Sequence, residues 1–214
     1  MRRRRVRCKF ADRRPGNGSI LRSSAYIFYL SAAVLPKGDM ITPDHSTTPE
    51  PITVLIMGVA GSGKTTIGSA VALALGWSFR DADEFHSAAN VTKMTLGIPL
   101  TDQDRMPWLT AIRAHITTCH ARGENAIVTC SALRERYRAA LIGPPANVRL
   151  VYLSGSFDVI HERLKLRIGH FMRPELLRSQ FETVESPTNA LLVDIDQSVE
   201  AIVKQVCAHL RQST

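Results

Sequence analysis

The segment Gly58–Thr65 constrains the fold of this chain more than any other feature. It reads GVAGSGKT, which fits the pattern G-x-x-x-x-G-K-[ST], and it follows the continuous apolar run 52–57. Such a run is typical of a central parallel strand that is buried on both faces. The residues after the loop, 64–75, have a helical pattern that Gly76 closes. A glycine-rich loop between a strand and a helix predicts a phosphate-binding loop (P-loop) in an α/β sheet.

The composition of this loop suits a nucleotide. Its glycines allow the backbone to approach phosphate oxygens, and the helix N-terminus adds the positive end of its dipole. We expect Lys64 to reach the β- and γ-phosphates of ATP as a catalytic residue and the Thr65 hydroxyl to ligate Mg²⁺. The alternative is a glycine turn without a ligand, which the flanking strand and helix disfavour. The predicted nucleotide-binding residues are Gly58, Val59, Ala60, Gly61, Ser62, Gly63, Lys64, Thr65 and Thr66.

Strand-like and helix-like segments alternate from Pro51 to the C-terminus. This alternation predicts an α/β protein, a three-layer P-loop NTPase fold with a five-stranded parallel sheet. We expect one domain over 51–214, preceded by a polar linker over 40–50. In addition to the first strand at 52–57, the predicted strands are 77–80, 126–130, 148–153 and 190–193. The further predicted helices are 101–121, 134–142, 157–168, 174–184 and 199–211.

The basic charge of the chain is confined to residues 1–39. That segment has ten Lys or Arg residues and two Asp, whereas 40–214 has 17 basic and 17 acidic side chains. The predicted domain is therefore neutral, and aromatic residues make up only 6% of the chain. Both observations argue against a nucleic-acid-binding surface on the domain. The four cysteines lack zinc-ligand spacing and predict a reducing compartment.

Three interpretations of residues 1–39 stay open. Met40 can be the natural start, because it precedes a polar stretch that leads directly into the first strand. An Arg-rich start followed by the apolar run 25–35 also fits a targeting leader, and that run is shorter than the roughly 20 apolar residues that span a membrane. The third interpretation is a disordered basic arm. An intact mass that matches a Met1 start would exclude a start at Met40.

Two carboxylates follow the second predicted strand, in the segment RDADEFH that ends at His86. The carboxyl end of a strand beside the P-loop is where an open α/β sheet binds ligands. Because alternate strand residues share a face, Asp81 and Asp83 can both face the site. We expect one to hold Mg²⁺ through water and the other to orient or deprotonate an acceptor hydroxyl. The alternative is a solvated acidic loop that caps the next helix.

Two further segments are unusually rich in charged and polar residues, even for loops. They are TDQDRMPW at 101–108 and CSALRERYR at 130–138. The first contains Arg105 at a predicted helix start. In the second, Arg134 and Arg138 lie four residues apart and share a face of the predicted helix, which suits an anionic acceptor. A solvated basic helix face is an equally good interpretation of that spacing.

The basic segment 161–173 is a candidate lid. It contains Arg163 and Arg167 and a glycine at position 169. Arginines on a closing segment can place positive charge on a migrating phosphoryl group and exclude water. The alternative is an ordinary basic helix and loop.

The order of these motifs resembles the gluconate kinase (gluconokinase) family of shikimate- and adenylate-kinase-like P-loop kinases. The resemblance covers Ile52 to the C-terminus. It rests on the P-loop together with DADEFHSAANVTKM, GIPLTDQDRMPW, CSALRERYR, RLKLRIGHF and QFETVESP. It implies transfer of a phosphoryl group from ATP to D-gluconate with Mg²⁺, a small substrate-binding segment, a lid, and in many members a homodimer.

The resemblance also implies roles for individual residues. Asp83 is then the acceptor-facing catalytic carboxylate, Asp81 lies near the metal, and the two lid arginines, Arg163 and Arg167, are catalytic. The implied gluconate-binding residues are Asp83, His86, Arg105, Arg134 and Arg138. Arg173 stands where relatives carry Lys, and the link between QFET and the last strand is shorter than the family pattern implies.

Two rival functions differ from this expectation. Within the same fold, the chain can phosphorylate another small hydroxy acid such as shikimate, and a substrate panel would decide. From a different class, the basic arm can bind nucleic acid or a membrane with the kinase fold as a nucleotide switch. For the folded domain we expect a small-molecule substrate, no nucleic acid and no membrane. The need for ATP predicts a cytoplasmic location.

Overall fold

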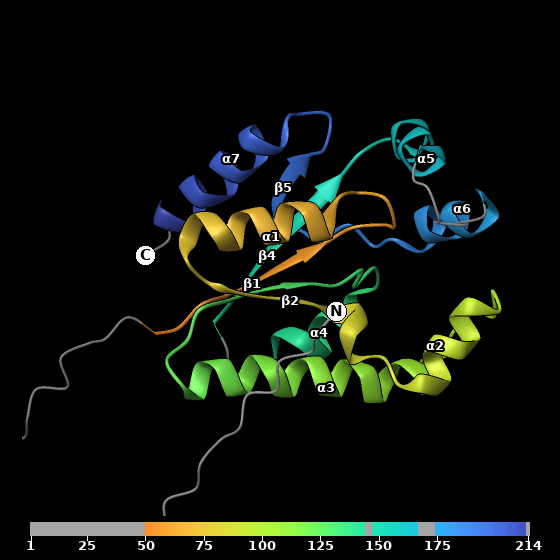
Figure 1. Cartoon of the computed structure of the whole chain (residues 1–214), viewed down its shortest axis with the longest axis horizontal. Helices are drawn as coiled ribbons and strands as arrows, with labels where there is room; N and C mark the ends of the chain where they lie inside the picture. The colour runs from red at the N-terminus through yellow and green to blue at the C-terminus, as the bar shows by residue number, and fades with distance from the viewer. Residues whose placement is uncertain (1–49, 144–146, 167–173, 213–214) are drawn as a thin grey trace, which may run out of the picture. The chain divides into compact units, whose positions relative to one another are not determined.

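Five parallel strands form the centre of the fold (Figure 1). The computed structural model describes residues 50–143, 147–166 and 174–212. The strands are β1 (Thr53–Met57), β2 (Ser78–Asp81), β3 (Ala126–Thr129), β4 (Val148–Ser154) and β5 (Leu191–Asp194). Their order in the sheet is β2-β3-β1-β4-β5, and every pairing is parallel. The predicted five-stranded parallel sheet is confirmed.

Helices cover both faces of this sheet, which makes three layers. In Figure 1, α1 (Lys64–Leu75) and α7 (Val199–Gln212) lie on one face, with α3 (Asp102–Ala121) and α4 (Glu135–Ile142) on the other. The remaining elements are η1 (Ala82–Phe85), α2 (Ala88–Thr95), α5 (Phe157–Lys165) and α6 (Pro174–Thr183). Helices α2, α5 and α6 lie towards the end of the molecule at which the strand arrows point (Figure 1). None of the helices described here has both the length and the apolar character needed to cross a membrane.

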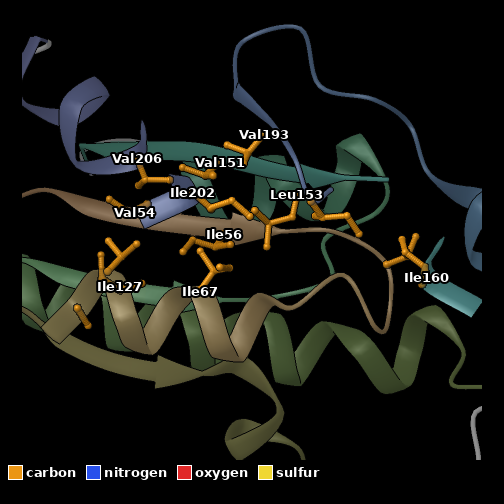
Figure 2. Packing of buried hydrophobic residues seen from close by; sticks show 14 of the residues in the cluster. Val54, Ile56, Ile67, Ile127, Val151, Leu153, Ile160, Val193, Ile202 and Val206 are labelled. Carbon is orange, nitrogen blue, oxygen red and sulfur yellow. The ribbon is translucent and has the colours of Figure 1, made fainter. Parts of the chain in front are cut away.

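The strand β1 separates two apolar cores. Val54 and Ile56 belong to the core beneath α1 and α7, while Leu55 and Met57 belong to the core on the α3 side. Successive strand residues point to opposite faces, so a strand buried on both faces must be apolar throughout. Figure 2 shows the first core, in which side chains from the sheet meet Ile67 of α1 and residues of α7.

Local capping explains the elements that periodicity did not predict. The short helices η1 and α2 were not expected, and each begins at a side chain that accepts a backbone hydrogen bond, Asp81 for η1 and Ser87 for α2. A correction concerns α4, which was predicted to begin at Arg134 and begins at Glu135. Arg134 is the N-cap with extended backbone, and its carbonyl oxygen accepts the Arg138 N–H at 3.2 Å, so only Arg138 lies within the helix.

Candidate active site

The P-loop connects β1 to α1 at the point where the strand order reverses. β3 lies on one side of β1 and β4 on the other, and ligands of open α/β sheets bind at such a switch point. Gly58 and Gly61 have φ values of 150° and 81°. A Cβ at Gly58 would lie 2.7 Å from the carbonyl oxygen of Leu153, and a Cβ at Gly61 would lie 2.7 Å from Cγ of Leu164. The loop therefore requires glycine at both positions to follow this path.

A pocket of about 260 Å³ lies against the P-loop. Its lining residues come from the loop and α1, from α5, from the chain between β5 and α7, and from α7 itself. Its lining residues are Gly61, Ser62, Gly63, Thr66, Ile67, Arg163, Ile195, Gln197, Val199 and Ile202. A mainly apolar pocket beside a phosphate-binding loop suits the base and sugar of a nucleotide.

The two cationic residues predicted for catalysis in the described part of the chain both lie at this loop or pocket. Lys64 Nζ donates to the carbonyl oxygen of Val59 at 3.0 Å, which holds the ammonium over the loop. Arg163 lines the pocket and donates to the carbonyl oxygen of Ile195 at 2.7 Å. Arg167, the second predicted lid arginine, lies outside the described residues.

The residues predicted to hold Mg²⁺ are in contact. The Thr65 hydroxyl donates to Oδ2 of Asp81 at 2.7 Å, at the N-terminus of α1 and the carboxyl end of β2. Mg²⁺ prefers oxygen ligands and commonly takes one or two protein ligands together with phosphate and water oxygens. Among the described residues, no group of three or more His, Cys, Asp and Glu side chains could hold a metal ion. The Thr65–Asp81 pair therefore fits an ion that the nucleotide phosphates also coordinate.

Asp81 also has the structural role that the alternative interpretation assigned to this segment. Its Oδ1 accepts the backbone N–H of Asp83 at 3.1 Å, and Glu84 completes a capping box at the start of η1. The capping role of Oδ1 is therefore observed, and the Mg²⁺ role of Asp81 stays a prediction.

Asp83 and His86 lie next to each other but differ in exposure. The side chain of Asp83 is 86% exposed, whereas that of His86 is 4% exposed, with Nε2 3.9 Å from Asp83 Oδ1. The His86 ring stacks on Trp108 at 4.4 Å, and the Trp108 indole N–H donates to the carbonyl oxygen of Ala82 at 2.7 Å. Burial lowers the pKa of His86, against the opposing effect of Asp83, and Arg105 lowers it further. η1 is therefore anchored on α3 while Asp83 remains accessible to a substrate.

A charged cluster joins the start of α3 to α4. Asp102 accepts a hydrogen bond from the Tyr137 hydroxyl at 2.5 Å and pairs with Arg136 at 2.7 Å, and Arg105 donates to the Tyr137 hydroxyl at 3.3 Å. The Tyr137 hydrogen bond is the main cause that lowers the pKa of Asp102, and Arg136, Arg134 and Arg105 act in the same direction. Two predicted acceptor-binding residues, Arg105 and Arg134, are thus brought to one cluster.

Lys93 of α2 connects that helix to α3. It pairs with Asp104 at 2.7 Å, and this bond, together with hydrogen bonds from Thr101, lowers the pKa of Asp104 to about 2. Asn90, which is buried, donates to the backbone carbonyl of Asp104 at 2.9 Å. α2 is therefore fixed on the first turn of α3, beside the charged cluster.

Arg138 has an arrangement that neither sequence interpretation anticipated. Its side chain is 2% exposed and donates to the carbonyl oxygens of Ala132 and Leu133, both at 3.1 Å. It also pairs with Glu135 at 2.5 Å. Arg138 is therefore not on a solvated face, and its guanidinium supports the turn between β3 and α4. Its predicted contact with the acceptor stays a prediction.

Sequence analysis assigned no role to three residues that link the site. Tyr137 holds Asp102, Gln180 contacts the P-loop and Glu185 contacts α4. All three stand in segments that supported the family resemblance, CSALRERYR and QFETVESP. The family motifs therefore marked these residues, but only their contacts in the structure show what they hold in place.

Comparison with known proteins identifies the class that this fold and site define. The family model of shikimate kinase matches residues 60–211. Together with the P-loop and the parallel sheet, this match makes the chain an ATP-dependent P-loop kinase of small molecules.

Closer relatives define the family within that class. The protein named "Probable gluconokinase" from Mus musculus is 42% identical over 181 residues, which cover 75% of this chain and 98% of the mouse protein. "Thermoresistant gluconokinase" of Escherichia coli (strain K12) is 42% identical over 153 residues, covering 70% of this chain and 87% of that protein. The crystal structure of a gluconokinase from Sinorhizobium meliloti 1021 has a TM-score of 0.68 and 41% identity, covering 76% and 93%. The chain belongs to the gluconokinase family.

Proposed function

We propose that the chain transfers the γ-phosphoryl group of ATP to a hydroxyl of D-gluconate and releases 6-phospho-D-gluconate and ADP. The main support is the position of Asp83, an exposed carboxylate in η1 just after β2, at the carboxyl ends of the strands where the P-loop also lies. The chain's similarity to gluconokinases over nearly their whole length supports the choice of gluconate over shikimate.

The nucleotide side has three parts. The P-loop backbone and the Lys64 ammonium hold the phosphates, and the apolar pocket holds the nucleoside. Thr65 and Asp81 would hold Mg²⁺, which neutralises charge on the phosphate oxygens when bound. Arg163, at the pocket wall, adds positive charge towards the nucleotide.

On the acceptor side, Asp83 orients the acceptor hydroxyl and takes its proton as the oxygen attacks the γ-phosphorus in line. The new bond joins the acceptor oxygen to phosphorus while the bond to the ADP oxygen breaks. Burial lowers the pKa of His86 below its ordinary value, and its predicted contact with the acceptor stays a prediction. The carboxylate of gluconate pairs with arginines of the α3–α4 cluster, for which Arg105 and Arg134 are the candidates.

The first test is an ADP-release assay with gluconate, shikimate and no acceptor run in parallel. We expect turnover that depends on gluconate. Asp83→Asn should lower kcat by at least about 100-fold, because the base that takes the proton is lost. Near-normal turnover of Asp83→Asn would show that another group deprotonates the acceptor, and turnover with shikimate alone would exclude gluconate as the substrate.

Three further features accompany this proposal. Dependence on Mg²⁺ follows from the Thr65–Asp81 pair. A homodimer and a cytoplasmic location stay predictions, the first from the family resemblance and the second from the requirement for ATP.

A further inference from the structure

Residues 180–185, here called the bridge, contact both halves of the active site. The bridge comprises the end of α6 and the first residues after it. At its first residue, Gln180 Oε1 accepts the backbone N–H of Ala60 at 2.7 Å. Ala60 lies within the P-loop, so a side chain of α6 fixes the backbone of the phosphate-binding segment.

The last residue of the bridge fixes the acceptor side. Glu185 Oε2 accepts the backbone N–H of Glu135 at 2.5 Å, and the Glu185 N–H donates to the carbonyl oxygen of Leu133 at 2.8 Å. The N-cap of α4, Arg134, makes no side-chain capping bond of its own. Glu185 therefore caps α4 from another segment, and a carboxylate at a helix N-terminus is favoured by the helix dipole.

The bridge is short and held in place between these ends. The Val184 N–H donates to the carbonyl oxygen of Gln180 at 3.0 Å, and the Thr183 hydroxyl donates to that of Ser179 at 2.6 Å. Val184 packs against both apolar cores, on the two faces of the sheet. A helical segment with a packed side chain transmits a displacement of one end to the other more directly than a free loop would.

We propose that the bridge couples nucleotide binding to acceptor binding, with Gln180 and Glu185 as positioning residues. In this proposal, Gln180 passes a shift of the P-loop backbone on phosphate binding through the bridge to the start of α4. That start carries Arg134 and Arg136, which belong to the charged cluster. The inference rests on the proposed function for the identity of the acceptor, and the coupling must be reciprocal between the two ligands.

The test measures binding rather than turnover. The dissociation constant of gluconate is determined on the full chain, with and without a non-hydrolysable ATP analogue and Mg²⁺, and their ratio is the coupling factor. For the wild type we expect a factor of about 5 or more. Gln180→Leu removes the acceptor for Ala60 N–H at similar size, and Glu185→Ala removes the cap of α4. Each should bring the factor close to one, and the double variant should do no more than either single variant.

Two variants separate coupling from a general loss of structure. Gln180→Glu keeps an oxygen that accepts from Ala60, so it should retain the coupling factor even where its added charge weakens ATP-analogue binding. Glu182→Gln, an exposed position on the same helix, should match the wild type. If one single variant fails to fold, the variant at the other end of the bridge still decides.

The outcomes distinguish this inference from the proposed function. A wild type that binds no gluconate contradicts the proposed function itself. A wild type that binds gluconate with a factor near one, or single variants that keep the wild-type factor, would overturn the bridge proposal and leave the kinase assignment intact.

Discussion

Arg138 shows how one buried cation can serve the fold beside a site that binds anions. Its guanidinium holds the carbonyl oxygens of Ala132 and Leu133. Arg138→Met would leave these acceptors without their donor, so we expect the free energy of unfolding to fall by about 2–4 kcal/mol in a urea titration. The exposed Arg211→Met should change it by less than about 0.5 kcal/mol. Unchanged stability with a raised KM for gluconate would instead support the acceptor contact predicted from the sequence.

Some residue positions could be predicted because they depend on local sequence. The P-loop with Thr65 is of this kind, since a strand, a turn and a helix start fix it, and Asp81 was placed beside it because parallel strands end at the same side of the sheet. The environment of Arg138 could not be predicted, because its i,i+4 spacing from Arg134 carries meaning only if both residues are in the helix. Arg134 is instead the N-cap, and Arg138 turns back to the carbonyl oxygens of Ala132 and Leu133.

The buried His86 predicts a dependence of stability on pH. Burial, the main cause, lowers its pKa below the ordinary value of 6.5, and burial acts in the same direction on His115 and His120. Well above pH 6.5, from about pH 8, both the folded and the unfolded chain are neutral at these positions. Below pH 6.5, the unfolded chain binds protons that the folded chain does not, so the free energy of unfolding decreases as the pH falls from 6.5 towards the lower folded pKa values.

Replacing that histidine checks its share of the effect. His86→Phe retains a ring against Trp108 but cannot titrate. Urea titrations at several pH values below 6.5 measure the slope of the unfolding free energy against pH. For His86→Phe this slope should be smaller than for the wild type. The difference should be at most about 1.4 kcal/mol per pH unit, which is the contribution of one proton. An identical slope in both proteins would assign the effect to other groups.

Among the elements, α1 lies unusually close to the sheet. A Cβ at Gly68 would lie 2.6 Å from Cγ2 of Thr129 and 2.8 Å from Cε2 of Phe79. In an isolated helix, glycine to alanine stabilises by about 1 kcal/mol. Here we expect Gly68→Ala to destabilise by about 1–3 kcal/mol, since α1 must move away from β2 and β3. Thermal unfolding measures this, with the neighbouring exposed Ser69→Ala as the near-neutral control, and a raised Tm for Gly68→Ala would show that the packing yields.

The elements predicted best are those with long apolar patterns and clear caps. α1 has its predicted bounds, and α3 begins at Asp102, one residue after its predicted start, behind a capping box formed by Thr101 and Asp104. The two missed elements, η1 and α2, are short and exposed over much of their length, and α2 depends on a contact between Asn90 and α3. Periodicity cannot reveal a helix that a distant backbone carbonyl stabilises.

At the scale of the whole molecule, charge and catalysis belong to different parts of the chain. Residues 1–39 carry all of the excess positive charge, and the described site residues lie beyond position 57. We expect a chain of residues 40–214 to turn over gluconate as the full chain does in the ADP-release assay. Binding to polyanions, if the full chain shows it, should weaken with salt and disappear in the shorter chain. A large loss of turnover on shortening would give the first 39 residues a part in catalysis.

Both described ends of the kinase domain lie at the amino ends of the strands, opposite the P-loop. β1 enters the sheet at Thr53 and runs towards the loop, while α7 runs back after β5, so its last turn lies near the amino ends of the strands (Figure 1). A tether attached at residue 50 or at residue 212 would therefore leave from the side away from the pocket. Immobilised through either of these residues on an electrode or a bead, the enzyme would present its P-loop side to the solution, which suits a gluconate sensor.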